Sequence, residues 1–568
     1  MAKPTWDRLA YKLVLGGYAV LAMSSVLAGQ ISWDEETDYL GIRDQIAHAV
    51  LWLRGESPDY RAIHANLEYY GTVGLLPAWL LWFVQRGVFT GRFSFGRALF
   101  HPAAEHQLTG FFAISHAVLL LEMVLLSLVV VALARRLSLR LPWLAGALVL
   151  TTPTLLGHSF TNTKDLPFAL FYSLYTLGLV QRVQEPPRAS GVGPWRRPLA
   201  LALLGATLMI NQKMVALGPV LASELVLALL RWRRGGARPA GRRLALALLP
   251  ALALPAAALA GALALQPASW GQPPWRFVTE AFSTFAVHRW GGCMWFDGRC
   301  VGITDPSWSA GRYMLQWLGA KLPLLLILLP LVQVLAWLRQ GLRAGRGLGE
   351  WRPWRWDPTG QATLLVVLQL LVLPGLAVAG NSNLYDADRH LLFLVPPLAV
   401  LAVMGFERLR QLPTTRPPWR GARAWALALV ALLALGQLVD GLLLHPYQLA
   451  YFNEWARHRL NHTNTAVEYW SLSAKEAVQQ AQLRDLLPLN PTVRNSLATA
   501  PLAIGFRQLG GREEANATTQ LLFQVRSPED FRRSPPAGLI CDKPVVVSRR
   551  QVLAPKLVMS RLLVCRSA

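Results

Sequence analysis

Long apolar segments separated by short polar segments dominate the first 445 residues of this chain. An α-helix rises 1.5 Å per residue, so about 20 apolar residues are needed to cross the hydrocarbon of a bilayer. Polar "NQKM" interrupts the stretch 199–232, which favours either a tight hairpin or a broken helix. Counting that stretch as two, the pattern predicts about eleven spans, at 10–31, 110–134, 141–157, 166–182, 199–217, 219–232, 244–266, 313–338, 361–380, 390–408 and 424–444.

Two long regions between these spans do not follow the pattern. The first, 32–107, contains "LEYYGTVGLLPAWLLWFVQRGVF", which is apolar but carries Tyr, Trp, Gln and Arg. That mixture favours a helix lying in the membrane interface over a span. The second region, 267–312, is rich in Trp, Gly and Pro. We expect both regions to be loops on the outer side of the membrane.

The tail from 446 to 568 has the polarity of a soluble domain. Its short runs "KPVVVS" and "TQLLFQV" predict strands, and "AKEAVQQAQLRDLL" predicts a helix. A segment of about 120 residues is long enough for a core of its own. The fold class we predict is therefore an all-α polytopic membrane module over 1–445 with a small α/β domain over 446–568.

Composition supports the membrane class, since 53% of the residues are hydrophobic and only 15% are charged. The net charge of +24 would suggest nucleic acid only if its location were ignored. If the spans alternate, one side of the membrane holds 26 of the 56 Lys and Arg residues, in segments 1–12, 135–140, 182–197, 231–243, 339–355 and 408–423.

This positive-inside bias predicts a multi-pass protein of the cytoplasmic membrane with a cytoplasmic N-terminus. An odd number of spans then places the C-terminal domain outside. We interpret the basic loops as contacts to anionic lipid and expect no nucleic-acid partner. A cleaved signal peptide at the first apolar segment is disfavoured, because many further spans would follow it.

All four cysteines fall in the predicted outer regions, where disulfides persist. The local pairings we favour are Cys293–Cys300 and Cys541–Cys565. Four cysteines allow three connectivities, and four free thiols are the alternative.

Carboxylates gather directly after the first apolar segment, in "WDEETDY". Neighbouring carboxylates at a low-dielectric boundary have raised pKa values, because each disfavours ionisation of the other and desolvation disfavours both. Asp34 and Glu35 could then accept a proton from a hydroxyl or an amine. The alternative is a solvated acidic cap.

Two more outer turns carry charge. "TNTKDLPF" places Lys164 and Asp165 before a span, where Asp165 could simply favour the positive end of a helix dipole. "NLYDADRHLLF" places Arg389 and His390 before another span. Arg389 could contact lipid headgroups, or it could bind phosphate oxygens bidentately.

The loop 285–313 adds aromatic and basic residues on the same side, namely His288, Arg289, Trp290, Trp295, Trp308 and Tyr313. Such a cluster is ordinarily an interfacial belt. It could equally be a platform for a sugar or a prenyl chain. No single stretch is specific, but acids, bases and aromatics converge on one outer surface.

Several motifs together resemble the GT-C superfamily of integral-membrane glycosyltransferases, and most closely the bacterial members of family 39. These are relatives of the protein O-mannosyltransferases and of the lipid A aminoarabinose transferase. The motifs are "WDE", "GHSFTNTKDLPFAL", "HRWGG" with Phe296 and Gly298, the run from Tyr385 to Pro397, and the tail motif over 445–477. Two departures are Glu468 where Asp is expected and Thr163 where Pro is expected.

The resemblance implies a glycosyltransferase that moves a sugar from a polyprenyl-phosphate donor to a lipid, glycan or protein acceptor outside the membrane. It makes Asp34 the base, with Glu35 and Asp165 supporting the acceptor. No cofactor is required; a divalent metal ion held by Glu35 and His288 is optional. Phosphate would be bound by Arg389, His390, Lys164 and Arg289. Substrate would be bound by His288, Trp290, Trp308, Tyr313 and Tyr385.

Two other classes of function stay open. A transporter or flippase of lipid-linked saccharides is the first, although transporters more often carry ionisable residues near mid-bilayer. A membrane scaffold whose tail recruits partners is the second. The tail itself could be a stabilising lid or could recognise the acceptor. The identity of the sugar is not encoded in these motifs.

Overall fold

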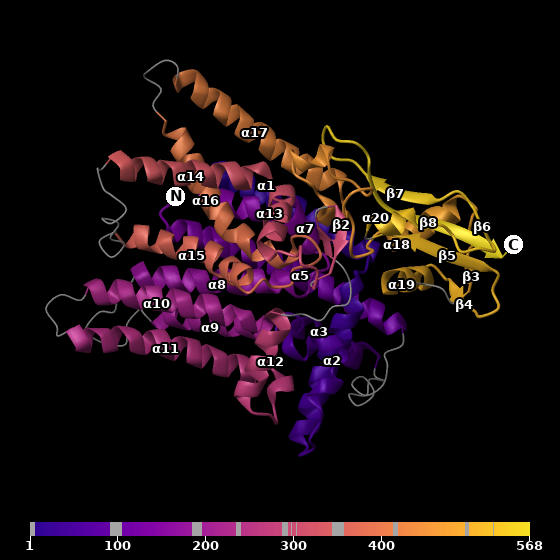
Figure 1. The fold of residues 1–568 in the computed structure, drawn as a ribbon, viewed down its shortest axis with the longest axis horizontal. Coiled ribbons are helices and arrows are strands. Elements are labelled where there is room, and N and C mark those ends of the chain that lie inside the picture. The colour runs from indigo at the N-terminus through magenta and orange to yellow at the C-terminus, as the bar shows by residue number, and fades with distance from the viewer. Residues whose placement is uncertain are drawn as a thin grey trace.

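The computed structural model describes residues 6–567 apart from 91–104, 185–195, 235–239, 287–293, 344–356, 413–418, 495–498 and the single positions 297, 303 and 526. Long helices run side by side in a bundle, and a domain containing a β-sheet lies at one end of it (Figure 1). The predicted fold class is confirmed: an all-α membrane module with a small α/β domain at the C-terminus.

The first part of the chain contains one helix that the hydrophobic pattern did not predict. After α1 (Trp6–Ala28), residues of the presumed outer loop form α2 (Trp33–Leu53), followed by the 3₁₀ turns η1 (Tyr60–Ala62) and η2 (His64–Tyr69). The predicted interfacial helix is α3 (Leu76–Thr90), and the next span is α5 (Glu105–Arg136). Four acidic residues in the first six positions of α2 mask its helical periodicity, so the sequence pattern resembles a loop.

Proline breaks the next predicted span in two. Segment 141–157 forms α6 (Pro142–Thr151) and α7 (Pro153–His158). Thr152 is extended between them, with φ −67° and ψ 112°, because the residue before a proline is disfavoured in the helical region. The helix α8 (Asp165–Gln184) follows.

The stretch 199–232 is a helix pair with a break at Lys213. It consists of α9 (Arg196–Gln212), the 3₁₀ turn η3 (Met214–Ala216) and α10 (Leu217–Arg234). The next helix, α11 (Ala240–Ala264), packs against both α9 and α10, so the pair is folded back as a hairpin (Figure 1).

The last third of the bundle begins with η4 (Pro267–Ser269), α12 (Pro274–Ala286) and the two-stranded ribbon β1 (Met294–Phe296) and β2 (Arg299–Val301). The predicted span 313–338 is bent, because α13 (Ala310–Lys321) and α14 (Leu324–Arg343) meet at an angle of 110°. Pro323 lies at the bend, and Leu322 before it is extended. The remaining helices are α15 (Pro358–Ala379), η7 (Arg389–Leu394), α16 (Val395–Arg410) and α17 (Trp419–Leu443).

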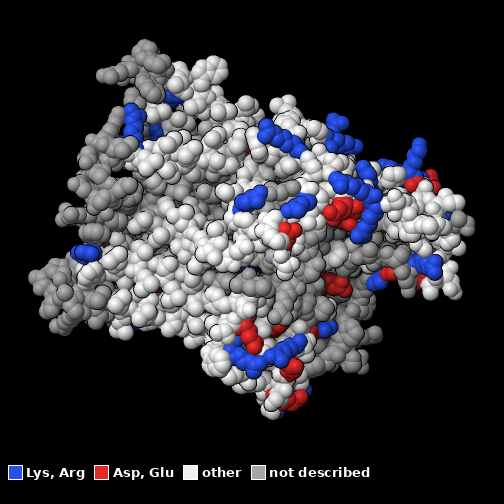
Figure 2. Space-filling model, in the orientation of Figure 1, with Lys and Arg blue, Asp and Glu red and all other residues white. Residues whose placement is uncertain are grey.

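Six helices in the described part of the chain are long and apolar enough to cross a membrane, or seven if α13 and α14 form one bent span. They lie in α1, α5, α10, α15, α16 and α17. The helices over the other predicted spans, α6 to α9 and α11, do not meet this criterion of length and hydropathy over their described residues. The chain is an integral membrane protein, and Figure 2 shows a mostly uncharged surface over the bundle in that view.

The tail folds around one antiparallel sheet. The long strand β8 (Leu557–Ser567) pairs with β5 (Thr519–Gln524), β6 (Leu539–Cys541) and β7 (Val545–Arg549). The tail also contains three helices, α18 (Ala474–Leu483), α19 (Ala500–Gln508) and α20 (Pro528–Arg532). It further contains the 3₁₀ turns η8 (Gln448–Ala450) and η9 (Ala456–His458) and a short parallel pair of strands, β3 (Thr492–Val493) and β4 (Arg512–Glu513). The predicted strands and helix are confirmed as β7, β5 and α18.

The predicted disulfide Cys541–Cys565 is confirmed and joins facing residues of β6 and β8. Cys300 is also disulfide-bonded, whereas its predicted partner Cys293 lies outside the described residues.

The core of the tail continues into the membrane module. One hydrophobic cluster joins buried residues of the sheet to Trp308, Tyr313 and Trp317 near and within α13. The two regions therefore share packing, and the boundary after residue 445 stays a prediction.

Candidate active site

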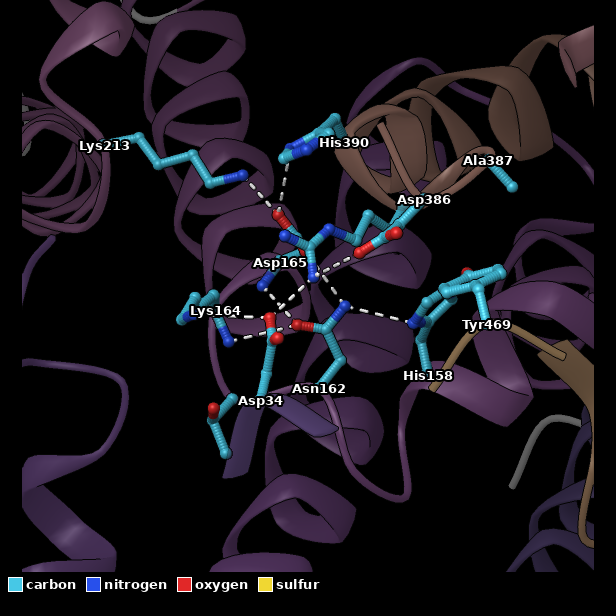
Figure 3. A network of polar contacts seen from close by, with 12 residues as sticks. Asp34, His158, Asn162, Lys164, Asp165, Lys213, Asp386, Ala387, His390 and Tyr469 are labelled. Carbon is cyan, nitrogen blue, oxygen red and sulfur yellow. Dashed lines mark hydrogen bonds and ion pairs between the residues drawn. The ribbon is translucent and has the colours of Figure 1, made fainter. Parts of the chain in front are cut away.

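Three elements that are far apart in sequence meet at the end of the bundle nearest the C-terminal domain. Asp34 lies in the first turn of α2, Asp165 begins α8 with Lys164 directly before it, and Arg389 begins η7. Figure 3 shows Lys213 and His390 pointing toward Asp165, and Lys164 lying beside Asp34. The three turns, which the sequence pattern predicts on a common membrane surface, contribute to one cluster of charged side chains.

Asp34 is held by two cations. Its Oδ2 accepts a hydrogen bond from Nη1 of Arg389 at 2.7 Å and lies 3.4 Å from Nζ of Lys164. About a quarter of the Asp34 side chain is exposed, whereas Arg389 is 4% exposed. The carboxylate is thus reachable while its cationic partner is buried.

Asp165 is the second centre of the cluster. Nζ of Lys213 donates a hydrogen bond to its Oδ1, and Nδ1 of His390 lies 3.9 Å from the same atom. Its Oδ2 accepts from Nδ2 of Asn162 at 3.0 Å and lies 4.0 Å from Nε of Arg389. Arg389 therefore bridges the two carboxylates.

The turn before η7 aims Arg389 into the site. Asp386 and Ala387 have φ values of 55° and 59°, in the left-handed region that a residue with a Cβ adopts at a cost. The carboxylate of Asp386 lies 3.4 Å from Nη1 of Arg389, and the amide of Ala387 donates to the hydroxyl of Tyr313 at 2.9 Å. Tyr313 is 1% exposed and supports this turn, and its predicted contact with substrate stays a prediction.

The expected rise in the pKa of Asp34 is wrong. Burial alone would raise it, but Lys164 and Arg389 together hold the pKa of Asp34 well below its usual range. The carboxylate whose pKa is raised is that of Asp38, four residues later on α2. Burial, opposed by Lys164 and reinforced by Asp34, raises the pKa of Asp38 to about 6.

Asp38 is tied to the turn before α8. Nζ of Lys164 lies 2.7 Å from its Oδ1, and the hydroxyl of Thr163 donates to its Oδ2. Lys164 is therefore shared by Asp34 and Asp38, and this second carboxylate belongs to the same network.

Glu35 points elsewhere. Its Oε2 accepts from the backbone N–H of Ser32 at 2.6 Å, and its Oε1 lies 2.5 Å from Nε2 of His116 in α5. These contacts fix the start of α2 but occupy both oxygens, so the fit of Glu35 to a metal ion is poor. No three His, Cys, Asp or Glu side chains gather closely enough for a metal ion within the described residues, and His288 lies outside them.

The other predicted site residues separate into three groups. Tyr385 lies against Arg389, whose guanidinium carbon is 4.7 Å from the ring centre, and its ring is also 4.7 Å from that of His390. Trp308 is buried and packs on Tyr313 at 5.2 Å. Arg289, Trp290 and His288 lie outside the described residues, so their roles stay predictions.

An apolar cavity of about 270 Å³ opens beside the charged cluster. Lys213, His390 and Tyr385 lie on its polar side. Its walls are mostly apolar and come from α8, α12, α13, α15 and η7, including Phe168, Phe282, Met314, Leu373, Leu376 and Phe393. A ligand with a negative head and a hydrocarbon tail matches both halves of this space.

Sequence reasoning missed Lys213, Asn162 and Asp38 as members of the network. The signal for Lys213 was present, because "NQKM" places a lone lysine between two apolar segments, where a charge is costly without a function or a partner. Asp38 follows Asp34 by four residues, which is one helical turn.

Comparison with solved structures finds proteins of similar architecture. A crystal structure of ArnT from Cupriavidus metallidurans bound to undecaprenyl phosphate is 15% identical, covers 97% of this chain and 97% of that chain, and has a TM-score of 0.42. The apo oligosaccharyltransferase of Archaeoglobus fulgidus is 11% identical over 78% of this chain and 56% of that chain, with a TM-score of 0.45.

A third structure, the archaeal oligosaccharyltransferase AglB from Archaeoglobus fulgidus in complex with an inhibitory peptide and a dolichol-phosphate, is 11% identical with a TM-score of 0.44. It covers 84% of this chain, which spans 58% of that longer protein. ArnT is a lipid A aminoarabinose transferase, the kind of protein that the sequence motifs resemble. No protein-family model and no curated protein sequence matches this chain.

Proposed function

We propose that this protein transfers a sugar from a polyprenyl-phosphate donor to an acceptor in the cell envelope, at the outer surface of the membrane. The observation that carries the proposal is the junction of the charged cluster with the apolar cavity. Lys213 and His390 belong to both, so a phosphate head and a prenyl tail could be bound together.

The donor phosphate would bind where Arg389, Lys213 and His390 converge. Guanidinium and ammonium groups stabilise the charge that develops on a leaving phosphate, and a phosphate leaving group needs no general acid. The prenyl chain would lie in the cavity, where each buried CH₂ contributes about 0.8 kcal/mol relative to water.

The acceptor would be deprotonated by Asp34. In this step the acceptor oxygen or nitrogen forms a bond to the anomeric carbon, the bond from that carbon to the phosphate oxygen breaks, and the acceptor proton passes to the Asp34 carboxylate. One displacement of this kind inverts the anomeric configuration.

The cations around Asp34 constrain when it can act as a base. While Nη1 of Arg389 bonds to Asp34, the carboxylate is a weak proton acceptor. A donor phosphate that takes this guanidinium would leave Asp34 with Lys164 alone and would raise its basicity. The base would therefore become active only when the donor is in place.

The test is a transfer assay with purified protein in bilayer nanodiscs and undecaprenyl-phosphate-linked sugars, with envelope lipids, glycans or peptides as acceptors. Wild-type protein should release undecaprenyl phosphate and form glycosylated product, and Asp34→Asn should bind the donor without transferring the sugar. A flippase would instead move the intact donor between leaflets and tolerate Asp34→Asn, which would contradict the proposal.

A further inference from the structure

A turn of the C-terminal domain, residues 468–473, enters the site described above. Its two aromatic residues, Tyr469 and Trp470, are at most 2% exposed, and both contact parts of the membrane module. This turn belongs to the tail motif over 445–477, in which Glu468 stands where Asp was expected. Contacts of Tyr469 with His158 and of Trp470 with Arg389 connect this turn to the charged cluster.

Glu468 organises the turn. Its Oε1 accepts from the backbone N–H groups of Trp470 and Leu472, each at 3.0 Å, and its Oε2 accepts from the hydroxyl of Ser473 at 3.0 Å. The Ser473 hydroxyl also bonds to that of Ser560 in β8 at 2.7 Å. The turn is thereby fixed to the central strand of the C-terminal sheet.

Tyr469 is linked to Asp165 through two side chains. Asn162 uses Oδ1 to accept from the backbone N–H groups of Lys164 and Asp165, at 3.1 and 2.8 Å. Its Nδ2 must then face Asp165 and Nδ1 of His158, at 3.0 and 3.1 Å (Figure 3).

This orientation of Asn162 sets the tautomer of His158. Burial lowers the pKa of His158 to about 3, so its imidazole is neutral. Because Nδ1 accepts from Asn162, the ring hydrogen is on Nε2, which donates to the hydroxyl oxygen of Tyr469 at 3.0 Å. Tyr469 thus anchors the ring that orients Asn162, and Asn162 orients Asp165.

Trp470 contacts the other half of the site. Its ring centre lies 5.4 Å from the guanidinium carbon of Arg389, and its ring meets that of His158 edge-to-face at 5.0 Å. Its carbonyl oxygen accepts from the backbone N–H of Trp33 at 3.0 Å, which caps the first turn of α2 immediately before Asp34.

We propose that Tyr469 and Trp470 are positioning residues of the transferase site, so that the C-terminal domain is a working part of the catalytic module. Tyr469 holds Asp165 in place through His158 and Asn162, and Trp470 holds Arg389 and the start of α2. This inference rests on the proposed function for its kinetic consequences, but its structural consequence can be measured without any substrate.

The substrate-free test is hydrogen–deuterium exchange of the full-length protein in nanodiscs. Tyr469→Phe should speed exchange over residues 158–168, because the imidazole loses its acceptor. The control Tyr451→Phe removes the same atom from an equally buried tyrosine of the same domain, which packs near Arg457 instead of the site. Unchanged exchange over 158–168 in Tyr469→Phe, or equal changes in both variants, would overturn the inference.

The kinetic test separates the two residues. Tyr469→Phe should lower kcat about tenfold, as expected for loss of one hydrogen bond, with the donor KM unchanged. Trp470→Leu should raise the donor KM about tenfold, and Trp470→Phe, which keeps an aromatic face for Arg389, should recover most of that loss. Parallel losses of kcat and affinity that follow only the melting temperature would show a purely structural role and overturn the inference.

The two proposals fail differently. If the wild-type protein transfers no sugar, the proposed function is wrong, and the exchange experiment still decides whether Tyr469 positions residues 158–168. If the wild-type protein transfers sugar and the Tyr469 and Trp470 variants match it in rate and in exchange, the positioning inference is wrong while the proposed function stands.

Discussion

Two buried arginines in this protein contact carboxylates in different ways: one pairs with a single carboxylate, and the other is shared among three. Arg182 of α8 faces Glu224 of α10 inside the bundle: Nη1 bonds Oε1, Nη2 bonds Oε2 at 2.9 Å, and both side chains are at most 5% exposed. Arg389 is equally buried but divides its contacts among Asp34 at 2.7 Å, Asp386 at 3.4 Å and Asp165 at 4.0 Å.

The difference distinguishes a structural ion pair from a binding site. A bidentate pair between one arginine and one carboxylate engages both carboxylate oxygens and fixes the guanidinium in one orientation. An arginine with one short contact and two long ones can exchange them for a phosphate at small cost. Breaking the first pair should therefore affect stability, and breaking the second should affect chemistry.

The largest effect should come from Asp34→Asn. Loss of a general base typically lowers the rate by 10²–10⁴, so we expect transfer to fall by about 1,000-fold while the melting temperature changes little. Asp44→Asn, a carboxylate on the same helix that pairs with Arg43, is the matched control and should transfer normally. If the two variants had similar rates, Asp34 would not be the base.

Glu224→Gln should have the opposite effect: it should lower stability and leave the rate of transfer nearly unchanged. Removing one partner of a buried pair leaves an uncompensated charge and costs about 3–5 kcal/mol of stability, measured by thermal unfolding in detergent. Transfer per folded molecule should stay near the wild-type rate. The double variant Arg182→Met/Glu224→Leu should regain most of the lost stability; a catalytic defect in it would remove the contrast between the two arginines.

Lys213→Met should weaken the phosphate site. Removing a group that stabilises developing charge lowers the rate by about 100-fold, and binding of undecaprenyl phosphate should weaken in parallel. The control is Lys475→Met in α18, whose ammonium bonds to the backbone of Ala28, away from the cavity. Equal donor affinity in the two variants would place the phosphate elsewhere.

The smallest effect concerns pH. Because the pKa of Asp38 is raised to about 6, this carboxyl becomes neutral as pH falls through 6, whereas Asp34, with a lowered pKa, stays ionised. Lys164 then pairs with Asp34 alone and weakens it as a base, so transfer should decline by roughly tenfold or less. Asp38→Asn should show that lower rate at every pH and no decline near pH 6; a decline that persists would assign the titration to another group.

Much of this site could be predicted from sequence. Asp34, Lys164, Asp165, Arg389 and His390 each lie where an apolar segment begins or ends, so a common membrane surface was expected. That surface does not specify contacts between residues such as Asp34 and Arg389, which are 355 positions apart.

The place of Asp38 beside Asp34 could not be predicted, because it depends on recognising α2 as a helix. Successive residues of an α-helix are about 100° apart around the axis, so Glu35 cannot share the face of Asp34, while Asp38 does. Reading 32–53 as a loop hid that relation and favoured Glu35. The contacts of Tyr469 and Trp470 depend on the docking of a whole domain, for which local patterns carry no signal.

A cryo-electron microscopy structure of the protein in nanodiscs with undecaprenyl phosphate would test the proposed donor site directly. Such a donor site predicts phosphate density against Arg389 and Lys213, prenyl density in the apolar cavity, and loss of the 2.7 Å contact between Arg389 and Asp34. Phosphate bound away from this cluster, with the contact between Arg389 and Asp34 intact, would contradict it.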